Sequence, residues 1–113
     1  MRRITLVKET GMYARLTSFQ LPPERFQDFL HIYEQQFLPA ARSSWTGFRD
    51  AYLLGDERDG DAAILLFWNT REDVQAIDES GEYAERLHLF ESLIDFPPVT
   101  DDYQVFRHPA DSG

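Results

Sequence analysis

The fold is decided by one stretch of sequence, Ala62-Ala63-Ile64-Leu65-Leu66-Phe67-Trp68, followed at once by Asn69-Thr70-Arg71-Glu72-Asp73. Seven consecutive apolar residues predict a buried strand, and Thr70 with an acid three positions later predicts a capped helix directly after it. Side chains of a strand alternate between the two faces of a sheet. This strand therefore carries apolar side chains on both faces: Ala63, Leu65 and Phe67 on one, and Ile64, Leu66 and Trp68 on the other.

Three further strands are predicted around this one. Residues 12–20 alternate in polarity as a strand requires, Gly47 opens a second strand over residues 48–54, and residues 103–107 form the last. The segment 55–61 is short and rich in turn-forming residues, so the strands on either side of it are expected to form an antiparallel hairpin.

Two amphipathic helices complete the pattern. The first begins after Leu21-Pro22-Pro23-Glu24, because proline suits the first turn of a helix and an acid suits its positive end. We expect Pro39 to break or kink this helix, since proline lacks a backbone donor. The second helix is interrupted near Ser80-Gly81 and ends at Pro97-Pro98. Apolar residues recur at helical spacing in both: Phe26, Phe29, Leu30, Tyr33 and Phe37 in the first, and Tyr83, Leu87, Phe90 and Ile94 in the second.

The order strand, helix, strand, strand, helix, strand predicts an α+β fold. Two helices can cover only one face of a four-stranded sheet, yet the strand 62–68 is apolar on both faces. A second copy of the chain would cover the other face by packing its own sheet against it. The sequence therefore predicts a homodimer through the sheet face, and a monomer with a partly wetted apolar face stays open as the alternative.

The length of the chain suits one domain. Of its 113 residues we assign 12–108 to this domain and expect residues 1–11 and 109–113 to be frayed ends. Apolar residues make up 42 % of the chain and aromatic residues 14 %, which is enough to form a core.

Charge and cysteine usage argue against several kinds of partner. Eleven Lys and Arg against twenty Asp and Glu give a net charge of −9, which would repel nucleic acid and anionic membranes. Cysteine is absent, which removes disulfides, thiolate nucleophiles and cysteine-type zinc sites, so the cytoplasm is the expected compartment. The longest apolar run has seven residues, whereas a membrane-spanning helix needs about 20. We expect a soluble protein.

Five segments, together with the order of the elements, resemble the antibiotic biosynthesis monooxygenase domain of the dimeric α/β-barrel superfamily. These segments are Tyr13-Ala14-Arg15-Leu16-Thr17, Leu38-Pro39-Ala40, Gly47-Phe48-Arg49, Ala51-Tyr52-Leu53-Leu54 and Trp68-Asn69-Thr70-Arg71-Glu72-Asp73. The resemblance implies a ferredoxin-like β-α-β-β-α-β protomer with a four-stranded antiparallel sheet, which closes a barrel across a dimer. It also implies a ligand pocket between the sheet and the helices.

The resemblance implies several activities. Some members oxidise polycyclic phenols to quinones without a prosthetic group, the substrate giving electrons to dioxygen; another branch degrades haem, and many members have no known activity. The haem branch would call for an Asn in the first strand and a Trp and a His on the later helices, where this chain has Ala14, Ile77 and Leu87-His88, so haem degradation is disfavoured. We expect a cofactor-independent monooxygenase of a small aromatic substrate, phenol or quinone in type. The alternative is a non-catalytic dimeric small-molecule-binding or stress-related module.

Five side chains are candidates for lining the pocket: Trp68, Tyr33, Arg15, Tyr52 and Tyr83. Trp68 offers an apolar wall and one indole N–H donor, and each tyrosine offers a hydroxyl, although all four aromatic residues suit a core equally well. Arg15 lies in the middle of a strand with two covered faces, so it needs either an anionic ligand or a salt bridge, for which Asp50 is a candidate partner.

The sequence gives little support for a catalytic histidine or for a metal site. His31 and His88 lie about 140° from the apolar stripes of their helices, at about 100° per residue, so both are predicted to face solvent. His108 lies at the end of the last strand. The acidic segment 55–61 does not match a calcium loop, because the glycine register puts Gly55 and Leu66 at ligand positions. No metal, no cofactor and no specific catalytic residue is predicted.

Overall fold

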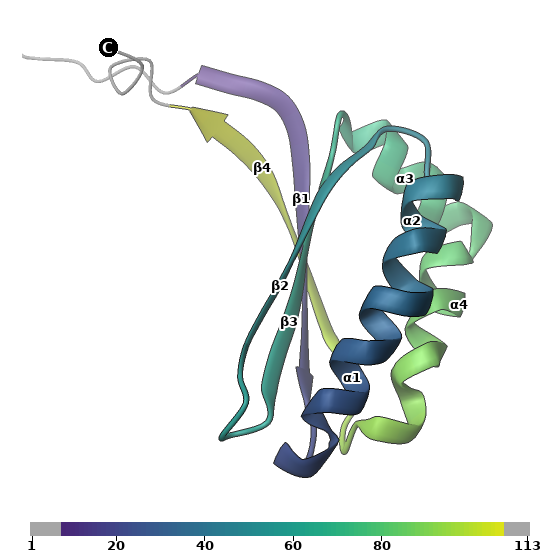
Figure 1. Ribbon diagram of the computed structural model, residues 1–113. Coiled ribbons are helices and arrows are strands. Elements are labelled where there is room, and N and C mark those ends of the chain that lie inside the picture. The colour runs from purple at the N-terminus through teal and green to yellow at the C-terminus, as the bar shows by residue number, and fades with distance from the viewer. Residues whose placement is uncertain (1–7, 108–113) are drawn as a thin grey trace, which may run out of the picture.

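The computed structural model of the protein describes residues 8–107, and Figure 1 shows its two layers. The strands are β1 (Lys8–Gln20), β2 (Phe48–Asp56), β3 (Asp61–Trp68) and β4 (Val99–Arg107), which pair antiparallel in the order β2-β3-β1-β4. The helices are α1 (Phe26–Ile32), α2 (Leu38–Ser44), α3 (Arg71–Ser80) and α4 (Glu82–Leu87), with the short turns η1 (Pro23–Arg25), η2 (Tyr33–Phe37) and η3 (His88–Leu93). The α+β, ferredoxin-like β-α-β-β-α-β prediction is confirmed.

The helices all lie on one face of the sheet (Figure 1). On that face Ile64, Leu66 and Trp68 of β3 are fully buried. The residues between them, such as Leu65 and Phe67, point to the other face and are only half-buried. The two-faced apolar pattern predicted for β3 is therefore present, and one of its faces lacks a covering layer within residues 8–107.

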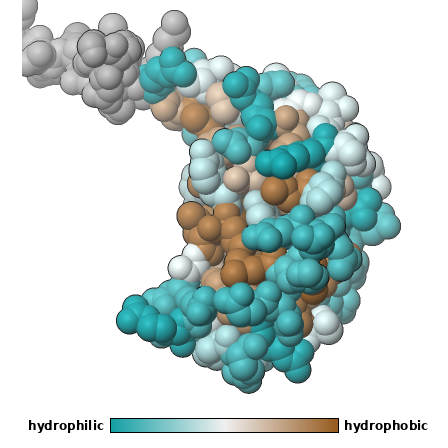
Figure 2. All heavy atoms as spheres, in the orientation of Figure 1, coloured by the Kyte–Doolittle hydropathy of each residue, from teal (hydrophilic) through white to brown (hydrophobic). Residues whose placement is uncertain are grey.

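The uncovered face of the sheet, which we call the outer face, is apolar. Its centre is the cross-strand pair of Leu16 and Leu65. Large apolar side chains from the two edge strands are exposed around it: Tyr52 and Leu54 of β2, and Val99 and Tyr103 of β4. Figure 2 shows hydrophobic atoms gathered on the concave side of the molecule, where Figure 1 shows this face of the sheet.

The first helical segment does not end at Pro39. It continues through α2 to Ser44, and the turn before the proline, η2, is a π turn in which Leu38 N–H donates to the carbonyl of Tyr33. A π turn is wider than an α turn, so it leaves room for a proline ring that would otherwise clash with the carbonyl four residues earlier. Pro39 therefore alters the winding of the helix without breaking it.

The second helical segment begins and breaks at the residues predicted from the sequence. Thr70 caps α3 by accepting a hydrogen bond from Asp73 N–H at 3.1 Å. Gly81 then ends α3 in the left-handed conformation, with φ at 76°, and α4 begins in a new direction. None of the helices within residues 8–107 is long and apolar enough to cross a membrane.

The strands at the two ends of the chain are longer than predicted. β1 begins at Lys8, four residues before the predicted start, and pairs there with the end of β4, so the segment from Lys8 to Gly11 is not a frayed end. β4 begins at Val99, earlier than the predicted 103. The remaining predicted ends, residues 1–7 and 109–113, and also His108, lie outside the described residues.

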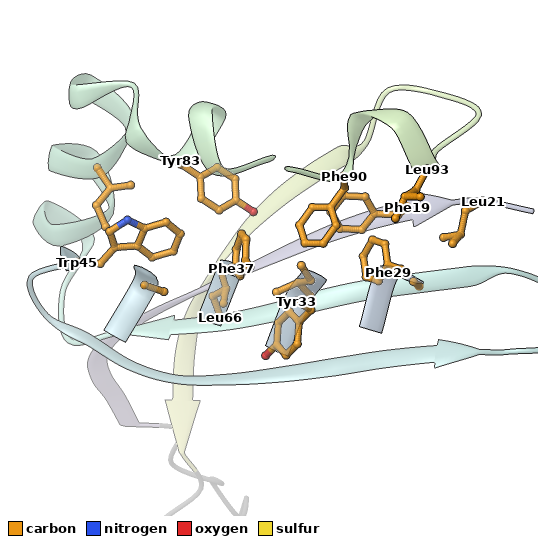
Figure 3. Close-up of a cluster of buried hydrophobic side chains, with 14 of the residues drawn as sticks. Phe19, Leu21, Phe29, Tyr33, Phe37, Trp45, Leu66, Tyr83, Phe90 and Leu93 are labelled. Carbon is orange, nitrogen blue, oxygen red and sulfur yellow. The ribbon is translucent and has the colours of Figure 1, made fainter. Parts of the chain in front are cut away.

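The space between sheet and helices is filled by aromatic rings (Figure 3). At one end Phe19, Phe29 and Phe90 pack together, with ring centroids 4.4 to 5.4 Å apart. At the other end Trp45 packs against Phe37 and Tyr83, with both centroid distances at 5.7 Å. The family-like pocket expected from the sequence is therefore occupied by the protein's own side chains.

Candidate functional site

Arg15 is a buried charge at the centre of the molecule. It lies in the middle of β1 on the helix-covered face, and only 4 % of its surface is exposed. Its Nη1 and Nη2 donate to the two carboxylate oxygens of Asp78 at 2.7 Å each. Its Nε and Nη2 donate to Asp102 at 2.7 and 2.9 Å. Carboxylates therefore occupy four of the five N–H donors that a guanidinium carries.

Strand register explains this geometry. Arg15 lies directly opposite Asp102 in the β1 and β4 pairing, so both side chains point to the same face of the sheet. Asp78 reaches the same point from the last turn of α3. The predicted salt bridge between Arg15 and Asp50 is wrong, because Asp50 is on β2, two strands away, where it pairs with Phe67 of the outer face.

The ion pairs keep the guanidinium charged. Burial alone would lower the pKa of Arg15, but the hydrogen bonds and charges of Asp78 and Asp102 outweigh it and raise that pKa above its ordinary value. The side chains of Asp78 and Asp102 are 47 % and 34 % exposed, so water still solvates part of each carboxylate. Of the two roles considered for Arg15, the ion pair is the one observed.

Tyr83 of α4 covers the guanidinium. The Arg15 Cζ lies 4.6 Å from the centroid of its ring, within the range of a cation–π interaction. The Tyr83 hydroxyl is hydrogen-bonded to the Thr17 hydroxyl, which lies 3.1 Å from that of Thr100. Burial raises the pKa of Tyr83 to about 12. Tyr83 therefore stays protonated near neutral pH and can donate a hydrogen bond, but it is a poor base.

Two stacked indoles lie beside this pair. Trp68 is fully buried, and its ring lies 6.0 Å from the Arg15 Cζ and 5.8 Å from the ring of Trp45, at an interplanar angle of 24°. The Nε1 atoms of Trp45 and Trp68 are both buried, and neither has a hydrogen-bond partner. Buried donors normally find an acceptor. Each of these two N–H groups can therefore donate a hydrogen bond to an oxygen atom of a ligand or of water.

The other two predicted pocket residues lie elsewhere. Tyr33 is buried in the π turn, and Figure 3 shows its hydroxyl pointing away from the middle of the cluster; burial raises its pKa. Tyr52 is on the outer face with 52 % of its surface exposed, and a hydrogen bond from its hydroxyl to Asp50 raises its pKa. Of the five candidates, the structure brings together Arg15, Trp68 and Tyr83.

Trp45 was missed by the sequence analysis although a signal for it exists. Tyr33, Phe37, Ala41 and Trp45 follow one another at intervals of four, which continues the buried stripe of the first helix. Pro39 was expected to break or kink the helix, so the stripe was not followed beyond Phe37.

Histidine lies away from this centre. His31 and His88 are exposed, as predicted, and His88 Nδ1 lies 3.0 Å from a carboxylate oxygen of Glu91 on the surface. Within residues 8–107 no group of three His, Asp or Glu side chains is arranged to hold a metal ion. We call this cluster the aromatic centre. It consists of the paired Arg15, the protonated phenol of Tyr83 and the indoles of Trp45 and Trp68, whose N–H groups lack a partner.

The fold defines the class of protein to which the chain is similar: it is the ferredoxin-like fold of the antibiotic biosynthesis monooxygenases, as the sequence resemblance implied. A monooxygenase of Streptomyces coelicolor, solved in complex with the ligand nanaomycin D, superposes with a TM-score of 0.70 over 85 % of this chain and 88 % of that one, at 12 % identity. A Caulobacter crescentus protein named as a candidate antibiotic biosynthesis monooxygenase gives a TM-score of 0.69 over 87 % and 92 % of the chains, at 10 % identity.

A third similar structure is SnoaB, a cofactor-independent oxygenase from Streptomyces nogalater, with a TM-score of 0.63 over 88 % of this chain and 97 % of its own, at 11 % identity. No protein-family model matches the sequence, and no curated protein matches it either. Identities this low establish a shared fold and leave the activity to be argued from the residues.

Proposed function

We propose that the protein is a cofactor-independent oxygenase of a small aromatic substrate of the phenol type. The substrate enters between the sheet and helices α3 and α4 by displacing some of the side chains that fill this space. The observation that carries the proposal is the pair of buried, unpartnered indole N–H groups of Trp45 and Trp68 beside the Arg15 and Tyr83 pair. An aromatic wall with a few directed donors suits a flat molecule with one or two oxygen atoms. The similar folds of two known oxygenases support this reading.

The chemistry of the centre restricts the substrate. Tyr83 stays protonated and Arg15 is paired, so neither is suited to remove a proton from the substrate. The substrate must therefore ionise readily by itself, which favours extended phenols with a stable anion. One oxygen atom of dioxygen then becomes the second carbonyl oxygen of a quinone, and the other leaves as water with the two displaced hydrogens. All four electrons come from the substrate.

The residues of the centre have separate roles in this proposal. The indole N–H groups of Trp45 and Trp68 donate to a substrate oxygen, and their rings hold the aromatic plane. A ligand enters beside Trp45, which lies in the connection between α2 and β2 and not within a strand. Gly47 in this connection has φ at 77°, and its carbonyl accepts from Asn69 N–H at 2.8 Å, which ties the connection to the end of β3.

A homodimer through the outer face is the proposed assembly. Leu16, Leu65 and Phe67 are half-buried there without a covering layer in the described chain, and exposed apolar faces of this kind mark interfaces. The cytoplasm, favoured by the lack of cysteine, is the proposed compartment.

A non-catalytic binding module is the second candidate, and one observation favours it. The centre lacks a histidine within residues 8–107 and Tyr83 has a pKa of about 12, so the chain supplies no evident base. Such a module would bind the same aromatic ligands without consuming dioxygen.

Oxygen uptake separates the two. Purified protein is given a panel of phenols and hydroquinones in an oxygen electrode with a metal chelator present. An oxygenase consumes dioxygen in proportion to the quinone formed, and Trp68→Phe, which keeps a ring and removes the N–H, slows turnover at least about tenfold. Tyr52→Phe, on the outer face, is the control and keeps the wild-type rate. Ligand binding without uptake would leave the module as the function.

A further inference from the structure

A second candidate ligand site lies at the end of α4 and is lined by none of the residues Arg15, Trp45, Trp68 and Tyr83. A hollow of about 430 Å³ opens there between α4, η3 and the segment 94–98 that leads into β4. Small-molecule pockets usually have volumes of about 300 to 1,000 Å³. The hollow is therefore large enough for a small organic ligand.

The floor and wall of the hollow are apolar and held in place. Leu87 and Ile94 are half-buried and form its floor. Phe96 stands at its wall with 61 % of its surface exposed, the highest value among the large apolar side chains of residues 8–107. Asp95 N–H donates to the carbonyl of Gln20 at 3.1 Å, and Pro97-Pro98 follows, so the backbone that carries Phe96 is tied to β1 on one side and stiffened on the other.

The rim of the hollow is acidic. Glu91 and Asp95 both line it and are exposed. Among the described residues, two basic side chains lie near this region: His88 lines the hollow with its Nδ1 3.0 Å from Glu91, and Arg25 reaches the carbonyl of Ser92 at 3.4 Å without lining the hollow. The chain as a whole carries a net charge of −9, which adds to the attraction for a cation.

We propose that this hollow binds a small organic cation, an ammonium group on an aromatic or aliphatic body. The body packs on Leu87, Ile94 and Phe96, and the ammonium group lies at the rim near Glu91 and Asp95. The open ring face of Phe96 also suits a cation. This site is separate from the aromatic centre and does not depend on the proposed oxygenase activity.

Three probes of similar shape and different charge test the proposal: 2-phenylethylammonium, 2-phenylethanol and phenylacetate. Each is titrated into ¹⁵N-labelled protein, and the backbone amide signals of residues 84–96 and the indole signals of both tryptophans are followed. We expect the ammonium probe to bind more tightly than the alcohol, and phenylacetate to bind least, with shifts in residues 84–96 and none in the indoles. Equal binding of all three probes, no shift, or shifts confined to the indoles would each overturn the proposal.

Variants sharpen the test. Glu91→Gln and Asp95→Asn keep the shapes of the side chains, and each should weaken binding of the ammonium probe about two- to fivefold without changing binding of the alcohol. Ala84→Phe fills the hollow from the exposed side of α4 and should abolish binding of both. Glu85→Gln, in α4 and outside the hollow, is the matched control for Glu91→Gln in η3, because it removes the same charge. Equal effects of Glu91→Gln and Glu85→Gln would show that only the net charge of the protein affects binding, and would contradict a specific site. Amide shifts that depend on protein concentration would reveal a second copy of the chain in the hollow and would also contradict the proposal.

Discussion

The Arg15 guanidinium stacks on the ring of Tyr83, with its Cζ 4.6 Å from the ring centroid. The same guanidinium holds Asp78 and Asp102. One side chain of β1 thus connects β4, α3 and α4, and its Cζ lies 6.0 Å from the Trp68 ring of the aromatic centre. The stability of the fold and the shape of the candidate site therefore depend on the same contacts.

Replacement of Arg15 should destabilise the protein because it leaves two carboxylates without their partner. Removal of one partner of a buried pair costs about 3–5 kcal/mol, and since Asp78 and Asp102 are partly exposed we expect about 2–3 kcal/mol for Arg15→Met. Urea unfolding at pH 7 and one fixed protein concentration measures this loss. Arg58→Met is the control, because the Arg58 side chain is 88 % exposed in its pair with Asp56 and should cost at most about 0.5 kcal/mol. Equal losses in the two variants would contradict a central role for Arg15.

Tyr83 should make the protein less stable at high pH. Its pKa is raised to about 12 in the folded protein, against about 10 in an unfolded chain, so the folded state binds more protons between these values and the free energy of unfolding falls as pH rises. Below pH 10 the contribution is fully present, and about 2–3 kcal/mol is lost as pH approaches 12. Tyr83→Phe cannot titrate and should show a shallower fall over this range. Tyr33 titrates in both the wild type and Tyr83→Phe, so the difference between their plots of unfolding free energy against pH reports Tyr83 alone. Parallel plots would contradict the burial of Tyr83.

Gly60 should tolerate alanine less well than Gly81. Both have positive φ, 78° and 76°, so an alanine is strained at either position by about 1 kcal/mol. A Cβ at Gly60 would lie 1.9 Å from the carbonyl oxygen of Leu21, whereas a Cβ at Gly81 meets nothing within 4 Å. We expect a loss of about 1 kcal/mol for Gly81→Ala and about 2–3 kcal/mol for Gly60→Ala. Thermal and urea unfolding of the two variants compares them directly, and a larger loss at Gly81 would contradict the close approach.

Leu65→Glu should dissociate the proposed dimer. Leu65 lies opposite Leu16 at the middle of the outer face, where a carboxylate would have to be buried between two sheets. Sedimentation at micromolar concentration should show a wild-type dimer and a monomer of the variant near 13.2 kDa. Gln35→Glu on the exposed surface of the helical layer adds the same charge and should leave the dimer intact. A wild-type protein that sediments as a monomer would refute the assembly.

The fold could be predicted further than the site. The spacing of residues within a segment is local information. It was enough to predict the apolar side chains on both faces of β3, the cap at Thr70 and the break at Gly81. Asp78 and Asp102 could not be found as partners of Arg15, because they are 63 and 87 residues away along the chain and meet it only through sheet register and helix packing. Trp45 could have been predicted from the apolar spacing alone, but Pro39 predicts a break or kink, whereas a π turn before the proline lets the helix continue.

The two tryptophans test the central claim most directly. The sequence has two of them, so an ¹H–¹⁵N spectrum of the labelled protein has two indole N–H signals, which substitution of each by Phe assigns. A polycyclic phenol that binds at the aromatic centre should shift both signals, because Trp45 and Trp68 stack with their ring centroids 5.8 Å apart and both Nε1 atoms lack a partner. Binding that leaves both indole signals unchanged, while amides elsewhere in the chain shift, would contradict the account.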